Sequence, residues 1–177
     1  MRDFLPQSVL RKILSYDSWT GKFYWRVNYG RSGTRGSEAG YIVKQNRKHS
    51  GEGYRKIRIF GREYLAHRLA WFYIHGKWPH EYIDHINSVR DDNRISNLRE
   101  ATKAQNAANT GVRSDNESGF KCVRFAKRQW PLKKPWIATI HKGSKYHHLG
   151  YFRTPEEAHA AYTVAAVEHF GEFARLR

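Results

Sequence analysis

The sequence predicts an α+β fold in two units. Segments with the period-two alternation of strands are interleaved with segments that have helical spacing, which indicates mixed secondary structure. Residues 111–117 hold turn-forming residues and one large apolar side chain, which is typical of a linker. Three strand candidates followed by one helix make up the last sixty residues. We therefore expect an N-terminal unit at 1–110 and, at 118–177, a three-stranded antiparallel sheet packed on one helix.

The N-terminal unit begins with a short amphipathic helix over residues 6–16, with Pro6 in its first turn. A hairpin follows, turning at residues 17–21. Residues 28–53 are rich in Gly, Ser, Arg and Lys, and this composition allows two interpretations. The segment is either a surface loop or a basic arm that follows a DNA backbone and becomes ordered on binding.

Residues 54–59 alternate as a half-buried strand, and residues 63–66 form its partner after a turn. A helix then runs to about residue 74 and ends at Gly76. His67, near the start of this helix, is expected to pack and hydrogen-bond rather than touch a phosphate. Arg68 beside it is a candidate phosphate contact.

In the C-terminal unit the strand candidates are residues 120–125, 136–141 and 146–149. Thr154, Pro155 and Glu157 predict the start of a helix that ends near Gly171. Small alanines let this helix lie close to the sheet. The sheet side of that core is expected from Val123, Ile140, Leu149 and Phe152. The other face of the sheet is then exposed, polar and basic.

Composition points to a polyanionic partner, because the 177 residues carry a formal net charge of +16. No apolar run is long enough to span a membrane, and the N-terminus lacks the features of a signal peptide. The single cysteine, Cys122, excludes an internal disulfide and a Cys₄ zinc ribbon. We expect a reducing, intracellular location in the cytoplasm or nucleoid.

Residues 83–109 carry the candidate chemistry: Asp84 and His85 stand together, and Asn97 and Asn106 follow. Cleavage of a phosphodiester needs a hard divalent cation to offset the phosphate charge, and such an ion prefers oxygen ligands. Asp84 and Asn106 can each supply one oxygen to Mg²⁺, or to Mn²⁺ as the alternative. A neutral imidazole, here His85, suits the removal of a proton from water.

The position of Asn106 is predicted by a helix start. Thr102 and Gln105 form a T-x-x-Q capping box, which places Asn106 in a short helix rather than in a loop. Asn97 stands between Ile95 and Leu98 and is expected to brace the polar loop through turn-like hydrogen bonds.

At these residues the stretch resembles the HNH endonuclease family, over residues 53–109. The resemblance implies a ββα-metal fold around one cation, with metal ligation by Asp84 and Asn106. It also implies that His85 is the general base and that Asn97 is the middle residue of the motif. Asn106 stands where many members have His, as in the homing-endonuclease branch.

Residues 118–176, with the elements WIATI, LGYF and EEAHAAY, resemble the Apetala-two or ethylene-response-factor DNA-binding domain. The resemblance implies a sheet that docks in the major groove of double-stranded DNA. Cys122 stands where that family usually has Gly, on the side expected to face DNA, and the first turn is longer and contains proline. The DNA contacts implied or expected here are Lys121, Arg124, Arg128, Thr139, His141, Lys145, Tyr146 and His148.

These expectations combine into one hypothesis: a homing-type HNH endonuclease of the kind found in phage genomes, acting as a monomer that nicks one strand. A double-strand break would need a dimer or a second visit. Two alternatives remain at this point. One is a DNA-binding regulatory protein whose nuclease unit is silent, and the other is a packaging or repair nuclease with low sequence preference.

Overall fold

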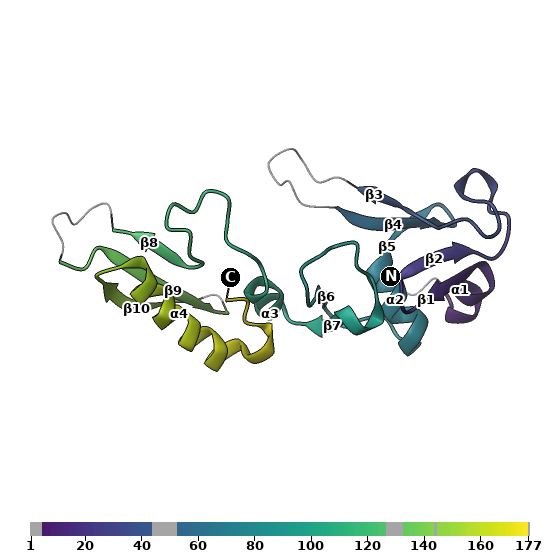
Figure 1. The fold of residues 1–177 in the computed structure, drawn as a ribbon. Coiled ribbons are helices and arrows are strands. Elements are labelled where there is room, and N and C mark those ends of the chain that lie inside the picture. The colour runs from purple at the N-terminus through teal and green to yellow at the C-terminus, as the bar shows by residue number, and fades with distance from the viewer. Residues whose placement is uncertain (1–4, 44–52, 127–132, 144, 177) are drawn as a thin grey trace. The chain divides into compact units, whose positions relative to one another are not determined.

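The computed structural model describes residues 5–43, 53–126, 133–143 and 145–176 (Figure 1). The chain divides into two compact units, Met1–Glu100 and Ala101–Arg177. In the described part of the chain, no helix has both the length and the apolar character needed to cross a bilayer.

The first unit starts with a helix and a hairpin, as predicted. Helix α1 (Gln7–Ile13) ends earlier than expected, because Leu14 is already extended and begins β1 (Leu14–Asp17). Strand β1 pairs antiparallel with β2 (Lys22–Trp25). The Asp17 carboxylate accepts hydrogen bonds from the backbone of Trp19 and Thr20, which fixes the turn between the strands.

A three-stranded antiparallel sheet follows, in the order β3-β4-β5. Its strands are β3 (Tyr41–Val43), β4 (Tyr54–Ile59) and β5 (Arg62–Leu65), and a 3-10 turn, η1 (Gly30–Ser32), precedes them. The prediction that 28–53 is entirely loop is wrong at residues 41–43, because these pair with β4. Residues 44–52 of that basic segment lie outside the described residues.

Helix α2 (Ala66–His75) packs on this sheet and ends at Gly76, as expected from the sequence. Gly76 has a φ of +72° and forms a left-handed C-cap. The core of the unit gathers around apolar side chains from both hairpin strands, β4 and the two helices, among them Leu10, Leu14, Phe23, Ile57, Ile59, Leu69 and Phe72. The chain then forms β6 (Tyr82–His85), a 3-10 turn η2 (Ile95–Asn97) and β7 (Leu98–Ala101). Strands β6 and β7 make a two-stranded sheet.

The second unit begins with α3 (Lys103–Ala108), whose capping box is present as predicted: Thr102 and Gln105 exchange side-chain and backbone hydrogen bonds. Strands β8 (Val123–Phe125), β9 (Trp136–Lys142) and β10 (Lys145–Phe152) form an antiparallel sheet in the order β10-β9-β8. Helix α4 (Pro155–Phe170) runs along one face of this sheet and leads into η3 (Gly171–Phe173) (Figure 1). The buried core between them holds Val123, Ala138, Ile140, Ala158, Tyr162 and Ala166.

The largest boundary differences from the prediction in the second unit are at the start of β8 and the end of β10. Residues 120–122 form a turn rather than the start of a strand, because Cys122 has a φ of +59°, which a strand does not allow. Strand β10 extends past Leu149 to Phe152, because a register irregularity between His148 and Gly150 lets pairing with β9 continue.

The structural division falls at residues 100 and 101, since α3 packs against α4 and η3. The boundaries expected from the sequence, with a nuclease unit ending at residue 110 and a linker at 111–117, stay predictions about which segments fold alone.

Candidate active site and outer sheet face

Asp84 and His85 end strand β6, and both side chains are buried, with 4% and 5% of their surface exposed. The strand is held at this depth because the preceding Ile83 belongs to the apolar core. Ionisable groups are rarely buried unless they are paired. The partners of these two residues therefore decide what the site can do.

Asp84 is paired with Arg99 of β7. The Nε atom of Arg99 donates to Oδ2 of Asp84 at 2.9 Å, and both side chains are largely buried. A charge-assisted bond of this kind fixes the carboxylate in one orientation. Nothing in the sequence pattern singled out Arg99, because its role depends on the pairing of two strands separated by a twelve-residue loop.

His85 lies among other rings and one amide. Its Nε2 is 3.3 Å from Oδ1 of Asn93, and its ring meets the ring of His67 edge-on with the centroids 5.0 Å apart. Tyr54 packs against both histidines. Burial lowers the pKa of His85, and the contact with Asn93 and the charge of Asp84 oppose this only in part. The imidazole is therefore neutral at pH 7, which is the form a general base needs.

His67 has the packing position expected from the sequence. It is buried, and burial together with the charges of His85 and Arg68 lowers its pKa to about 3. Among the described residues its Nδ1 has no hydrogen-bond partner. A buried neutral ring of this kind shapes the wall of the site.

The loop between β6 and β7 is braced by Asn97. Its Oδ1 accepts from the backbone of Asn87 at 3.0 Å, and its Nδ2 donates to the carbonyl of Asp92 at 2.8 Å. These are the bonds expected of a bracing residue. Asn93 in the same loop is 1% exposed and contacts His85. No role was predicted for it from the sequence, because this contact is visible in the structure alone.

Asn106 lies on α3, half-buried, in the second unit. Its place beside Asp84 on one cation stays a prediction. Over the described residues, no group of three or more His, Cys, Asp or Glu side chains could hold a metal ion. The donor set predicted here is one carboxylate and one amide oxygen, which fits a hard cation that keeps most of its water, such as Mg²⁺.

Arg68, a predicted phosphate contact, donates to the carbonyls of Glu81 at 2.7 Å and Pro79 at 3.1 Å. Both bonds fix the segment that leads into β6. We assign the guanidinium this structural role.

The face of the β10-β9-β8 sheet opposite the core residues Ala138 and Ile140 carries mainly polar and aromatic side chains, and we call it the outer sheet face. Cross-strand partners share a face, and the register pairs Arg124 with Ile137 and Ile137 with Tyr151. Thr139 pairs with His148, and His141 with Tyr146. Arg124, His141, Tyr146 and His148 are exposed. Five of the predicted DNA contacts, Arg124, Thr139, His141, Tyr146 and His148, thus lie together on the outer sheet face.

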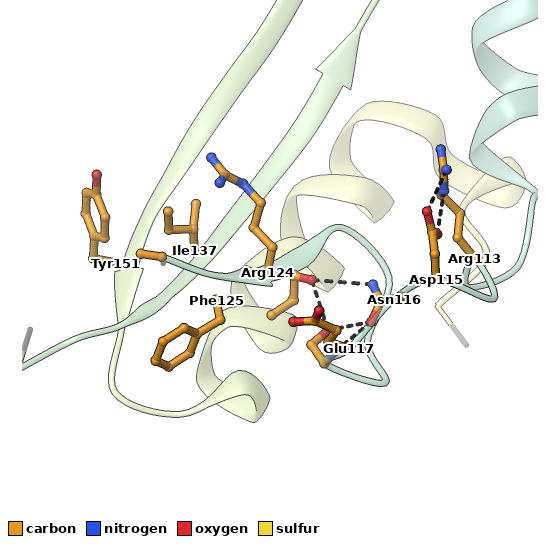
Figure 2. A pocket seen from close by; sticks show the side chains of 11 residues that line it. Arg113, Asp115, Asn116, Glu117, Arg124, Phe125, Ile137 and Tyr151 are labelled. Atoms are coloured by element: carbon orange, nitrogen blue, oxygen red, sulfur yellow. Dashed lines mark hydrogen bonds and ion pairs between the residues drawn. The ribbon is translucent and has the colours of Figure 1, made fainter. Parts of the chain in front are cut away.

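Part of this face borders a hollow of about 700 Å³. Figure 2 shows Arg124, Ile137 and Tyr151 projecting to the same side, with the Arg113–Asp115 ion pair at the far end of the loop that lines the hollow. The hollow is lined by both cationic and anionic side chains and by aromatic rings.

The remaining predicted contacts are placed differently. Lys121 is buried, its ammonium donates to the carbonyl of Ala108, and burial lowers its pKa, so it does not reach the surface and we exclude it as a DNA contact. Cys122 packs on the core with Tyr162, not on the side expected to face DNA. Lys145 is exposed at the start of β10, and Arg128 lies outside the described residues.

Residues 64–108 match the HNH endonuclease family. The matched HNH segment contains Asp84, His85, Asn97 and Asn106, and it also contains Asn93 and Arg99. Over 123 residues the chain is 32% identical to a protein of Acanthamoeba polyphaga mimivirus named as an uncharacterized HNH endonuclease. This alignment covers 69% of the chain and 61% of that relative. No solved structure matches the chain.

Proposed function

We propose that the chain is a metal-dependent DNA endonuclease that hydrolyses phosphodiester bonds, one strand at a time. The observation that supports this most strongly is the buried Asp84–His85 pair inside the matched HNH segment, with the imidazole kept neutral by burial.

In this proposal His85 is the general base. It takes a proton from water, and the resulting hydroxide attacks phosphorus. Asp84, oriented by Arg99, offers a carboxylate oxygen to a divalent cation, and Asn106 offers the second oxygen predicted from the sequence. When bound, the cation would offset the phosphate charge and stabilise the leaving 3′-oxygen. Asn97 keeps the loop in shape around these groups.

The outer sheet face is the proposed DNA-reading surface. Sheets can enter the major groove as helices do, and base edges there are read by hydrogen bonds. His141, Tyr146 and His148 are exposed side chains that can make such bonds, and Arg124 can contact base or phosphate. We propose that this unit selects the cleavage site, as in a homing-type enzyme, with the resemblance to the Apetala-two domain in support.

The test is a nicking assay on supercoiled plasmid with Mg²⁺, with Mn²⁺ and with chelator, using a plasmid library of genomic fragments so that a rare target is represented. The proposal expects relaxed circles that appear only with added metal. Footprinting the bound DNA then separates homing from low specificity, since a homing enzyme protects one defined site. DNA binding without cutting on every substrate would leave the regulatory alternative.

A further inference from the structure

The contact between Asn93 and His85 has a defined direction. The amide nitrogen of Asn93 lies 3.1 Å from the carbonyl oxygen of Asp91 and 3.4 Å from its carboxylate Oδ1. Both of those atoms only accept hydrogen bonds, so the NH₂ group must face them. The amide oxygen then faces His85, at 3.3 Å from Nε2.

An amide oxygen also only accepts, so the hydrogen between these atoms belongs to the histidine. Nε2 therefore carries the proton and donates to Asn93. In a neutral imidazole with Nε2 protonated, the lone pair is on Nδ1. We infer that Asn93 is a positioning residue that selects this tautomer and makes Nδ1 the atom of His85 that accepts the proton of water. This inference rests on the proposed function for the reaction, but the tautomer itself does not depend on it.

Ion pairs fix Asp91, which accepts hydrogen bonds from the side-chain amide of Asn93. Asp91 receives two hydrogen bonds from Arg55 of β4, both at 2.9 Å, and Arg55 also pairs with Glu38 at 2.7 Å. A bidentate arginine–carboxylate pair fixes the carboxylate plane. The carboxylate acceptor that orients the Asn93 amide is thus fixed by Arg55 of β4 as well as by the loop.

The backbone of Asn93 is held by the hairpin β1–β2. The hydroxyl of Tyr16 donates to the carbonyl of Asn93 at 2.7 Å. Gly21 closes against the same backbone: a Cβ there would lie 2.5 Å from the carbonyl carbon of Asn93 and 2.4 Å from the nitrogen of Arg94. Only glycine fits at that distance, and its φ of +74° is also one that glycine adopts without strain. The hairpin thus has a function in the site: it supports the residue that orients the base.

The proton balance follows from this arrangement. A water proton moves to Nδ1, the new hydroxide forms a bond to phosphorus, and the bond from phosphorus to the 3′-oxygen breaks. The leaving oxygen takes a proton from solvent water, and the imidazolium afterwards returns its Nδ1 proton to the hydroxide that this leaves. The imidazolium that results keeps its Nε2–H bonded to Asn93, whose oxygen stabilises the positive charge.

The direct test is long-range ¹H–¹⁵N NMR of the ¹⁵N-histidine-labelled full chain at pH 8, with His85 identified by its absence from the spectrum of His85→Gln. This experiment reads which ring nitrogen carries hydrogen. We expect a single neutral tautomer with hydrogen on Nε2. Hydrogen on Nδ1, a doubly protonated ring or an average of the two tautomers would each overturn the inference. Because no cleavage is measured, the result stands whether or not the proposed nuclease function holds.

The matched variant is Asn97→Ala, which removes side-chain hydrogen bonds to Asn87 and Asp92 in the same loop. It is expected to leave the tautomer unchanged, whereas Asn93→Ala produces an average or the other form. If Asn97→Ala changes the tautomer as much as Asn93→Ala, loop integrity rather than Asn93 sets it, and the inference fails.

Kinetics separate positioning from structure. Asn93→Ala is expected to lower the single-turnover rate at saturating DNA by about 10- to 100-fold, with unchanged DNA affinity. This is the scale for losing the partner that orients a functional ring.

Asn93→Asp restores an acceptor for Nε2 but places a carboxylate against Asp91. Positioning predicts that it cleaves faster than Asn93→Ala, and a merely structural role predicts the reverse. In the His85→Ala background, Asn93→Ala is expected to cause no further loss. A wild type that shows the expected tautomer but never cleaves would contradict the proposed function and leave the tautomer assignment intact.

Discussion

The two units place their polar residues in opposite ways. In the first unit the candidate catalytic residues are buried: Asp84, His85, Asn93 and Asn97 each expose 6% or less of their surface. In the second unit the candidate DNA-reading residues are exposed, and Tyr146 has 71% of its surface accessible. The side chains of Asp84 and His85 contact Arg99 and Asn93, whereas on the outer sheet face His141 contacts the ring of Tyr146 and His148 that of Tyr151.

This difference in burial matches the different requirements of catalysis and of DNA recognition. Catalysis gains from groups held in one geometry before substrate arrives, because the ordering has already been done by folding. Reading DNA needs groups that can exchange water for base edges, so they must be on the surface. Substitutions in the first unit should therefore change rate and stability together, and those on the outer sheet face should change affinity alone.

Expressing the second unit alone should separate DNA binding from cleavage most completely. Residues 101–177 expressed alone are expected to fold, because they have their own core, and to bind duplex DNA without cutting it. Circular dichroism and a fluorescence anisotropy titration measure the two properties. An unfolded fragment, or a folded one that ignores DNA, would show that the second unit is not an independent reader.

Removing the charge of Asp84 should have the next largest effect. Asp84→Asn keeps an oxygen for Arg99 but weakens cation binding, so cleavage should fall by about 10²-fold or more, the loss expected when metal stabilisation of several kcal/mol is weakened. The rate should partly recover at higher Mg²⁺. The control is Asp115→Asn, which also removes a carboxylate paired with an arginine at 2.9 Å but lies in the second unit. Equal loss in both variants would argue against a ligand role for Asp84.

Burial of His67 should make stability depend on pH. Its pKa is about 3 in the folded chain and near 6.5 when unfolded, so only the unfolded state gains a proton between these values. The contribution of neutral His67 to the free energy of unfolding is then fully present above pH 6.5. It falls as the pH drops toward 3, with a slope of up to about 1.4 kcal/mol per pH unit. Urea denaturation at several pH values should show a shallower dependence for His67→Phe, which keeps a ring in the same place. An unchanged slope would contradict the burial of a neutral His67.

On the outer sheet face, neighbouring histidines provide a matched pair. His148 pairs with Thr139 on the outer sheet face, whereas His147 pairs with the core residue Ile140 and so belongs to the opposite face. His148→Ala should weaken DNA binding by about fivefold to tenfold, the value of one specific contact of roughly 1 kcal/mol. His147→Ala should leave affinity unchanged. If the two variants weaken binding equally, the outer sheet face is not the reading surface.

What the sequence could predict was local. The capping box at Thr102, the helix start at Thr154 and the cap at Gly76 depend on residues within one turn, and the structure confirms all three. The α+β class is likewise confirmed by the arrangement of elements. Signals of this kind are carried by neighbours in the chain, so a single sequence contains them.

What it missed depends on pairing between distant residues. Strand β3 is assigned by its partner β4, since its own neighbourhood has loop composition. Arg99 and Asn93 acquire their roles from Asp84 and His85 across the β6–β7 loop. Lys121 looked like a surface cation by type, but the turn at Cys122 directs it to the carbonyl of Ala108.

The most direct test of the account is single-turnover cleavage by wild type and His85→Ala, measured with DNA affinity on the same preparations. Loss of a general base lowers the rate by about 10²-fold or more. We predict that loss with unchanged affinity, because His85 is buried in one unit and the proposed reading surface lies in the other. Metal-dependent cleavage at equal rates in the two proteins would contradict the assignment of His85 and, with it, the proposed active site.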